Sequence, residues 1–344
     1  MCLVPGPVTL SQVAREAGVS LATASRAING SANRTVHPDL RERVLAAAER
    51  LRYLPNGNAQ AMARGRGSSL GLIVHDIADP FFASIAAGVT IAADRAGLAV
   101  TLASTQHDVA REPGLVELLT RQRARAIIVA GGRRTDDAVN ARMCTALKDF
   151  RRSGGTVSVI GQALFEFDTV VIGNRDGAAD LARALHERGY RRFAVLAGPA
   201  DHLTARDRLL GFSETLEELG DPIDPGAVIT TAFTRDGGYD GMTTLLNARR
   251  DIELVFAVND VMAVGAMAAA RELGTRVPDD IAVAGFDDIL ALRDITPALT
   301  TVRIPLIEVG VTATELALES PTEEPRLVHV GGTVVLREST PVRA

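Results

Sequence analysis

The sequence is poor in the residues that build several common kinds of site. Its 344 residues contain no tryptophan, 4% aromatic residues and two cysteines, Cys2 and Cys144, which excludes a disulfide framework, and no Cys/His spacing typical of structural zinc occurs. The only lysine is Lys148, and no lysine-containing phosphate-binding loop is present. There is no run of 18 apolar residues and no signal-peptide pattern at the start. We expect a soluble, cytoplasmic protein without a cofactor or metal.

Charge is distributed unevenly along the chain. Residues 1–66 contain nine arginines and four acidic residues, a net charge of +5, so the remaining 278 residues have a net charge of −10. A basic head on an acidic body suggests that the head alone meets a polyanion. On charge alone, a chance asymmetry remains the alternative.

The first 55 residues predict three short helices. The first covers 10–17 and ends at Gly18, a residue that tolerates the left-handed backbone of a tight turn. The second covers about 20–29, with a serine at its start where an N-cap belongs. The third begins at Pro38, a favoured first residue of a helix. Two helices joined by a glycine turn, with a third packed on them, are typical of a helix-turn-helix.

The second of these helices has two distinct faces. At roughly 100° per residue, Ala24, Ala27 and Ile28 point toward the other helices. Arg26 lies on the opposite face, and its paired donors are suited to guanine in the major groove. Leu21 either touches a thymine methyl group or extends the core. The DNA contacts expected from this region are Thr9, Ser20, Leu21, Ala22, Ser25, Arg26 and Asn29.

From Leu70 onward, short apolar runs alternate with helical segments. The strand-like runs are 70–75, 98–103, 126–130, 157–160, 170–173, 193–197, 228–230, 254–258 and 281–285. Continuous apolar strands separated by helices predict parallel sheets covered on both faces. About nine such strands fit two doubly wound α/β lobes better than one wide sheet. In such folds ligands bind at the carboxyl ends of the strands.

The chain resembles the lactose-repressor (LacI/GalR) family of bacterial transcription regulators over nearly its whole length. The residues that show this resemblance are Val8-Thr9-Leu10, Ala17-Gly18-Val19-Ser20, Ser25-Arg26, Asn29-Gly30, Pro55-Asn56, Asp79-Pro80-Phe81-Phe82, Gly211-Phe212, Asn259-Asp260 and Gly285-Phe286-Asp287-Asp288. The resemblance implies a ligand-responsive repressor that binds a near-palindromic operator as a homodimer, with a tetramer as a further possibility. It also implies lobes like those of periplasmic sugar-binding proteins.

We divide the chain accordingly into three parts. Residues 1–55 form the DNA-binding domain, 56–69 a hinge helix and linker, and 70–344 the effector-binding and dimerisation domain. Within the last, one lobe comprises about 70–162 and 301–320 and the other about 163–300 and 321–344. The resemblance implies that the hinge segment contacts the minor groove through Asn56, Ala59 and Met62. Met62 would wedge between base steps, or else pack against the second copy of the chain.

The resemblance also implies a small-molecule effector between the lobes. The expected contacts are Phe81, Phe82, Gln162, Arg208, Phe233, Asn259 and Asp287. Arginine offers paired donors and aspartate accepts from hydroxyls, although both residue types also cap helices or bridge lobes, and Phe82 equally suits the core. Gly161-Gln162 and Gly173-Asn174 stand where sugar-binding members often have aspartate. The effector is therefore a sugar, a sugar derivative or a nucleobase-like compound, or an anion bound by Arg208 and Arg175.

Two other classes of protein are considered. An enzyme is disfavoured because the glycines near 65–71 precede their strand, and because His75-Asp76 and His107-Asp108 have no accompanying nucleophile motif. A solute-binding protein, or a small-molecule receptor that uses the lobes without controlling DNA, is disfavoured by the basic head. Binding to an operator would separate these alternatives.

Overall fold

The computed structural model describes residues 8–29, 35–53, 67–249 and 251–343. The chain divides into two compact units, Met1–Ser68 and Ser69–Ala344. Within the described ranges, no helix combines the length and the apolar character needed to cross a bilayer. In the same ranges, no group of three or more His, Cys, Asp or Glu side chains is arranged to hold a metal ion.

The first unit contains three helices, as predicted: α1 (Leu10–Glu16), α2 (Leu21–Asn29) and α3 (Pro38–Arg50). They enclose a small core of alanines and valines, namely Val13, Ala14, Ala17, Ala24, Ala27, Val44 and Ala47. Short side chains let the three helices approach closely, because little volume separates their backbones. Gly18 has a φ of +63° and turns the chain between α1 and α2.

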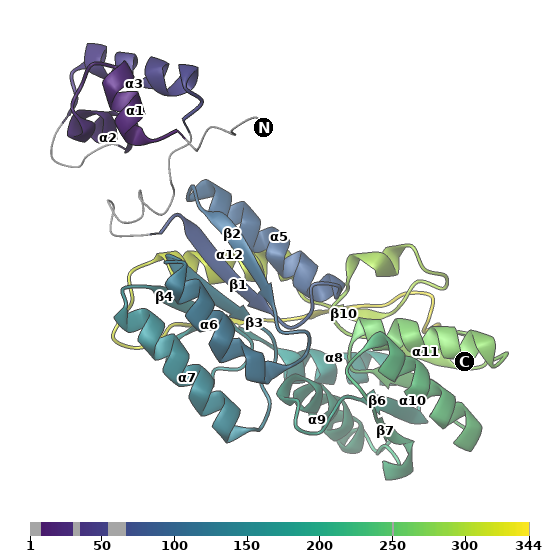
Figure 1. Ribbon diagram of the computed structural model, residues 1–344. Helices are drawn as coiled ribbons and strands as arrows, with labels where there is room; N and C mark the ends of the chain where they lie inside the picture. The colour runs from purple at the N-terminus through teal and green to yellow at the C-terminus, as the bar shows by residue number, and fades with distance from the viewer. Residues whose placement is uncertain (1–7, 30–34, 54–66, 250, 344) are drawn as a thin grey trace, which may run out of the picture. The chain divides into compact units, whose positions relative to one another are not determined.

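The second unit consists of two α/β lobes (Figure 1). The first lobe is built on a parallel six-stranded sheet of order β11-β5-β4-β3-β1-β2. Its strands are β1 (Ser69–Val74), β2 (Ala99–Ser104), β3 (Ala126–Ala130), β4 (Thr156–Ile160), β5 (Asp168–Ile172) and β11 (Leu327–Val330). Helices α5 (Pro80–Arg95) and α12 (Leu306–Leu318) pack together on one face, and α6 (Glu112–Arg121) and α7 (Asp137–Arg152) on the other. A short helical turn, η1 (Val109–Arg111), precedes α6.

The second lobe repeats this plan on a smaller sheet of order β7-β6-β8-β9. Its strands are β6 (Phe193–Ala197), β7 (Val228–Thr230), β8 (Leu254–Ala257) and β9 (Ala282–Ala284). Helices α8 (Asn174–Glu187) and α9 (Leu203–Glu218) pack together, as do α10 (Arg235–Ala248) and α11 (Asp260–Glu272). Two short helical turns, η2 (Pro225–Ala227) and η3 (Leu290–Arg293), complete the lobe. The predicted pair of doubly wound lobes is confirmed.

The burial pattern of β1 shows why its strand is apolar throughout. Leu72 and Val74 face the α5/α12 side of the sheet, whereas Ile73 faces the α6/α7 side. A strand covered on both faces has no solvent-exposed side, so it shows no alternation of polar and apolar residues. This is the signal from which the sequence predicts parallel sheets.

The predicted lobe boundaries need correction. β5 pairs with β4 and β11 pairs with β5, so residues 168–172 and 327–330 belong to the first lobe rather than the second. β10 (Thr301–Arg303) pairs antiparallel with β12 (Thr333–Val335) beside α8, so 301–303 belong to the second lobe. The chain therefore crosses between lobes three times, after β5, β10 and β11. The strands β10, β11 and β12 are short, and each pairs with a segment far away in the sequence, which a local apolar pattern does not indicate.

Candidate functional site

The predicted faces of α2 agree with the burial of its side chains. Ala24 and Ala27 are buried and Ile28 packs against the same core. Leu21 is 52% exposed, so it does not extend this core. Ala22 is also exposed, next to Leu21 at the start of the helix. The helix therefore presents small and polar side chains on the face opposite the core, as a helix that docks in a groove requires.

Arg26 is held in place on this exposed face. Its Nε donates to the backbone oxygen of Ala22 at 3.0 Å. Of the five N–H donors of an arginine, this bond uses one, and the two terminal nitrogens have no partner among the described residues, which leaves them for a base edge. Asn29 donates to the hydroxyl of Ser25 at 3.3 Å on the same helix.

Ser20 and Thr9 lie at the starts of two helices. The Ser20 hydroxyl accepts from the backbone N–H of Thr23 at 3.1 Å, which caps α2. The backbone N–H of Thr9 donates to the side-chain oxygen of Gln12 at 2.7 Å and closes the start of α1. Contact of these two residues with phosphate remains a prediction. Asn56, Ala59 and Met62 lie outside the described residues.

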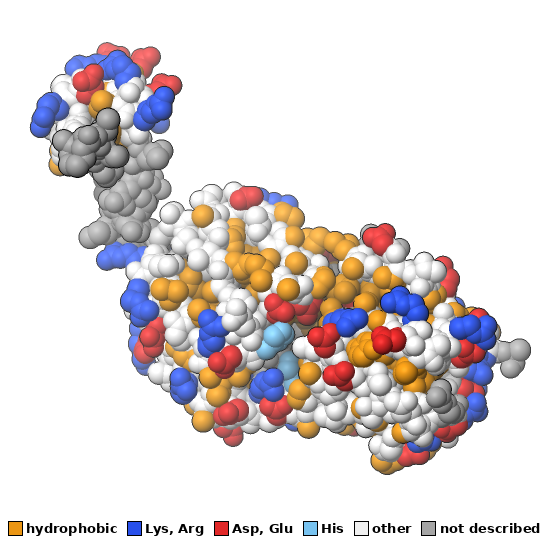
Figure 2. Space-filling view, turned by 45° about the vertical axis from the view of Figure 1, so that its right-hand side comes forward, with side chains coloured by type: hydrophobic (Ala, Val, Ile, Leu, Met, Phe, Trp, Pro, Cys, Tyr) orange, Lys and Arg blue, Asp and Glu red, His pale blue; other side chains and the backbone are white. Residues whose placement is uncertain are grey.

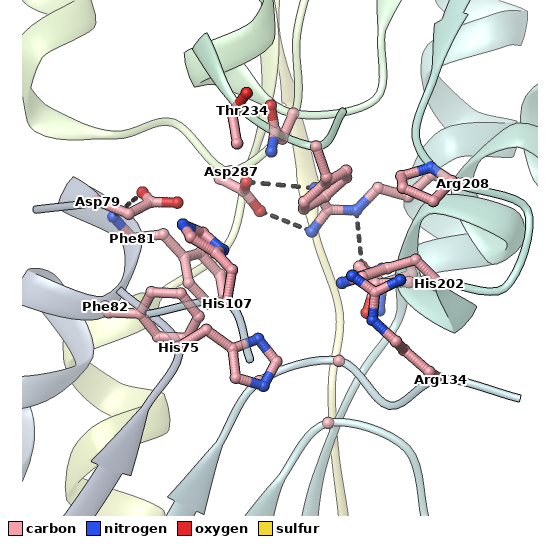
Figure 3. A pocket seen from close by; sticks show the side chains of 18 of the residues that line it. His75, Asp79, Phe81, Phe82, His107, Arg134, His202, Arg208, Thr234 and Asp287 are labelled. Carbon is pink, nitrogen blue, oxygen red and sulfur yellow. Dashed lines mark hydrogen bonds and ion pairs between the residues drawn. The ribbon is translucent and has the colours of Figure 1, made fainter. Parts of the chain in front are cut away.

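A cavity of about 200 Å³ lies between the two lobes at the carboxyl ends of their strands. Figure 2 shows histidine side chains at the surface in the middle of this unit, and Figure 3 shows the cavity from close by. The polar residues that line it are His75, Asp79, His107, Arg134, Asn174, His202, Thr204, Arg208, Thr234, Asn259 and Asp287. Its apolar wall includes Phe81, Phe82 and Phe233.

Five helices begin at this cavity within the described residues: α8 begins at the lining residue Asn174, and the other four have side-chain caps. Asp79, His202, Thr234 and Asn259 are the N-caps of α5, α9, α10 and α11, and the side chain of each accepts a backbone N–H of its helix. Helix N-termini direct partial positive charge and donors outward. The cavity therefore favours an electron-rich polar ligand, such as one that bears hydroxyl or carbonyl oxygens.

Arg208 and Asp287 form a buried ion pair at the cavity wall (Figure 3). Nη2 and Nη1 of Arg208 donate to the carboxylate at 2.7 and 3.2 Å. Nη1 also donates to the Val258 oxygen at 2.8 Å, and Nε donates to Asn174 Oδ1 at 2.8 Å. Burial raises the pKa of Asp287 to about 6, although Arg208 opposes the rise. Four of the five guanidinium hydrogens are thus committed, and one on Nη2 remains for a ligand.

Six of the seven predicted effector contacts line the cavity: Phe81, Phe82, Arg208, Phe233, Asn259 and Asp287. Gln162 does not. Its side-chain oxygen accepts from the Arg133 backbone N–H at 2.9 Å, and its amide donates to Thr204 Oγ1 at 3.0 Å, so it connects elements behind the wall. Phe82 is 7% exposed and serves both core and wall. Arg175 is absent from the lining and pairs with Glu214.

The sequence does not predict His202, Arg134 or Thr234 as lining residues, and it considers His75 and His107 only as enzyme candidates. His75 and His107 follow β1 and β2, and the others follow β3, β6 and β7. Their shared signal is position: each lies just after the carboxyl end of a parallel strand. That signal selects the loops but does not say which side chain in each loop turns inward.

Hydrogen bonds join the two lobes beside the cavity. Arg134 Nη1 donates to both oxygens of Asp201, at 2.8 and 3.0 Å. The backbone N–H of Thr135 donates to the backbone oxygen of Asp201 at 3.0 Å. The backbone N–H of Leu203 donates to the backbone oxygen of Arg133 at 2.9 Å. The loop after β3 is thereby fastened to the loop after β6, which holds the lobes in one arrangement.

Comparison with known protein families identifies both parts of the chain. Residues 9–56 match the bacterial regulatory proteins of the lacI family, and residues 182–340 match the periplasmic binding protein-like domain. The HTH-type transcriptional regulator GalS of Salmonella typhimurium is 35% identical over 316 residues, which cover 91% of this chain and 89% of GalS.

Solved structures give the same result. The lac repressor dimer bound to operator and the anti-inducer ONPF aligns with a TM-score of 0.82 at 28% identity, over 97% of this chain and 99% of that one. The complex of the transcriptional regulator CelR with cellobiose aligns with a TM-score of 0.70 at 31% identity, over 96% of this chain and 99% of that one.

Proposed function

The chain belongs to the LacI family of bacterial regulatory proteins, and from that premise we propose how its two sites work together. It is a ligand-responsive, DNA-binding transcriptional regulator rather than an enzyme. Our proposal is that it represses catabolic or transport genes. It would do so in the cytoplasm, on the nucleoid, as a homodimer on a near-palindromic operator, with the effector in the cavity between the lobes.

The effector we propose is a neutral, polar ring compound: a sugar, a sugar derivative or a nucleobase. The observation that supports this is the pairing of the charges at the cavity. Both arginines that line it are matched by carboxylates, Arg208 by Asp287 and Arg134 by Asp201. Burial raises the pKa of Asp79, the remaining carboxyl in the lining. An anion would therefore find no unpaired arginine among the described lining residues, whereas a neutral polyol would find donors and acceptors.

Coupling between ligand and DNA follows from the bonds that join the lobes. A ligand shifts an equilibrium only if it binds one arrangement better than another. The cavity wall comes from both lobes, so its shape depends on their separation, and the Arg134–Asp201 pair joins the lobes in the arrangement of this structure. We propose that this arrangement sets the spacing of the two linkers in the dimer and hence their fit to the operator.

Apolar side chains on the first lobe support dimerisation. Ile91 on α5 is 42% exposed, Leu102 on the edge strand β2 is 38% exposed, and Ile307 on α12 is 46% exposed. α5 packs against both β2 and α12, so these side chains belong to neighbouring elements. An apolar surface of this kind is covered by another protein surface more often than left in water. Light scattering during gel filtration should give a dimer, or a tetramer if dimers pair, and Ile91→Asp should give monomers.

The experiment that tests the proposed function is a titration of labelled operator with the purified chain, with and without candidate effectors. The operator comes from selection on genomic fragments. Tight binding that one neutral sugar or nucleobase changes at least tenfold supports it. Operator binding that no neutral compound changes, together with a response to an anion, would overturn the effector assignment.

A further inference from the structure

His75 and His202 reach the cavity from different lobes and rest on consecutive glycines. His75 follows β1 in the first lobe, and His202 is the N-cap of α9 in the second. A methyl group on Gly131 would come within 2.6 Å of the His75 ring, and one on Gly132 within 2.8 Å of the His202 ring. Only bare glycines leave room for both imidazoles, so both rings pack against the loop after β3.

The carboxylate of Glu112 lies next to Nε2 of the His75 ring. Nε2 of His75 lies 3.3 Å from Oε1 of Glu112 and is closed off from solvent. Arg133 donates to both oxygens of the same carboxylate, at 2.5 and 2.8 Å. The Nε2–H tautomer of His75 directs its proton toward Glu112 and leaves Nδ1 as the acceptor for the cavity.

His202 presents the opposite kind of hydrogen-bonding atom to the cavity, a donor. Its Nδ1 accepts from the backbone N–H of Ala205 at 3.4 Å, so this nitrogen has no proton. The ring stacks on Phe233 with centroids 4.6 Å apart. Burial, helped by the nearby Arg134, lowers the pKa of His202 to about 3, so the ring is neutral at physiological pH. Its proton is therefore on Nε2, which has no partner among the described residues and is a donor for the cavity.

We propose that His75 and His202 are specificity-determining residues for the ligand, one presenting an acceptor and the other a donor. The matching ligand edge bears both a donor and an acceptor, as vicinal hydroxyls or the N–H and C=O of a nucleobase do. This inference rests on the proposed function, because it assumes that the cavity binds a ligand. Since the two rings belong to different lobes, such an edge also bridges the lobes.

The first test measures the proton positions without any ligand. Long-range ¹H–¹⁵N spectra of the imidazoles in the full chain should show both rings as the Nε2–H tautomer, with His75→Gln and His202→Gln giving the assignments. Glu112→Gln should move the His75 proton to Nδ1, because the amide oxygen faces Arg133 and the amide N–H₂ faces the ring. The His202 signals should not change. An Nδ1–H tautomer on either ring of the unmodified chain would overturn the inference.

The second test uses calorimetry with cellobiose, D-ribose, adenine and hypoxanthine. For a compound that binds, His75→Gln and His202→Gln should each weaken binding about tenfold, since each leaves a buried ligand group unpaired. His186→Gln is the matched control, because His186 pairs with Asp221 at 3.1 Å and is not part of the cavity lining. Binding of a sugar would identify vicinal hydroxyls as the matching edge, and binding of a nucleobase would identify its N–H and C=O.

Two results separate the inference from the proposed function. Unchanged affinity in both histidine variants would overturn the inference while leaving the effector site intact. If none of the four compounds binds, the failure concerns the choice of effector, and the tautomer measurement still decides the inference. Glu112 is fully buried, so melting of the Glu112→Gln variant is checked first. If it unfolds, the unmodified chain's two tautomers serve as the test.

Discussion

Arg208 and Asp287 face each other as a bidentate ion pair on the wall of the ligand cavity, with only 1% and 5% of the two residues exposed. The guanidinium also lies 3.9 Å from the centre of the Phe286 ring. Arg208 is therefore a fixed part of the wall, and it offers the ligand only the hydrogen that its partners leave free.

Arg208→Lys should abolish the response to effector and destabilise the chain. An ammonium keeps the charge but cannot reproduce the paired geometry, so the loss should be smaller than the cost of removing one partner of a buried ion pair, which is about 3–5 kcal/mol. Chemical denaturation measures the loss, and an operator titration measures the response. Arg175→Lys is the control: its pair with Glu214 is exposed, so the expected change is below about 1 kcal/mol. Equal effects of the two substitutions would contradict the prediction.

Arg134→Ala and Asp201→Ala should each weaken the contact between the two lobes. The pair is partly exposed, with side chains 30% and 48% accessible, so its contribution is below about 1 kcal/mol, or roughly a two- to fivefold loss of effector affinity. A double-mutant cycle on affinity isolates this coupling. Arg183→Ala is the control, because it removes an exposed pair with Asp180 on α8 that is not part of the cavity lining. A coupling energy of zero would show that the pair does not help to hold the two lobes together.

Asp260 should make the stability of the chain depend on pH. It accepts from Thr301 Oγ1 at 2.7 Å and from the Ile289 N–H at 2.9 Å. Burial, with the nearby Asp287 carboxylate, raises the pKa of Asp260 to about 8. Between about pH 4 and pH 8 the unfolded chain releases this proton and the folded chain keeps it. The free energy of unfolding from this group therefore falls as pH rises, by on the order of 1.4 kcal/mol per pH unit.

Asp260→Asn removes this ionisation. The free energy of unfolding of the variant, relative to that of the unmodified chain, should therefore be higher at pH 8 than at pH 5. Urea denaturation at the two pH values gives the comparison. Parallel pH profiles for the two proteins would show that Asp260 is ionised in the folded state.

Arg26→Ala should relax the preference for guanine at one position of each half-site, at a cost of about 1–3 kcal/mol. Arg15→Ala, at the end of α1, should leave the preference unchanged. Selection of operator variants with each protein measures both. A uniform loss on all sequences would instead make Arg26 a phosphate contact.

The arrangement of the elements could be predicted because its signals are local. The glycine at position 18, Pro38 and the continuous apolar strands each specify a turn, a helix start or a buried strand. The pairing of β11 with β5 could not, because it joins residues about 160 positions apart that share no local pattern. The same limit explains the lobe boundaries that needed correction.

The residues of the candidate site could likewise be predicted only in part. Arg208 and Asp287 were identifiable from the resemblance, but their mutual pairing depends on tertiary contacts. Gln162 has the chemistry of a ligand contact, yet two bonds hold it behind the wall. His202 lines the site because α9 packs close to the glycines after β3, a tertiary contact that the sequence does not indicate.

The most direct measurement is selection of genomic DNA fragments by the purified full chain, at stated salt concentration, with and without pooled neutral sugars and nucleobases. We predict recovery of a short near-palindrome, and a change in that recovery when the pool is added. Recovery of no sequence above background under both conditions would contradict the account of the chain as a ligand-responsive operator-binding protein.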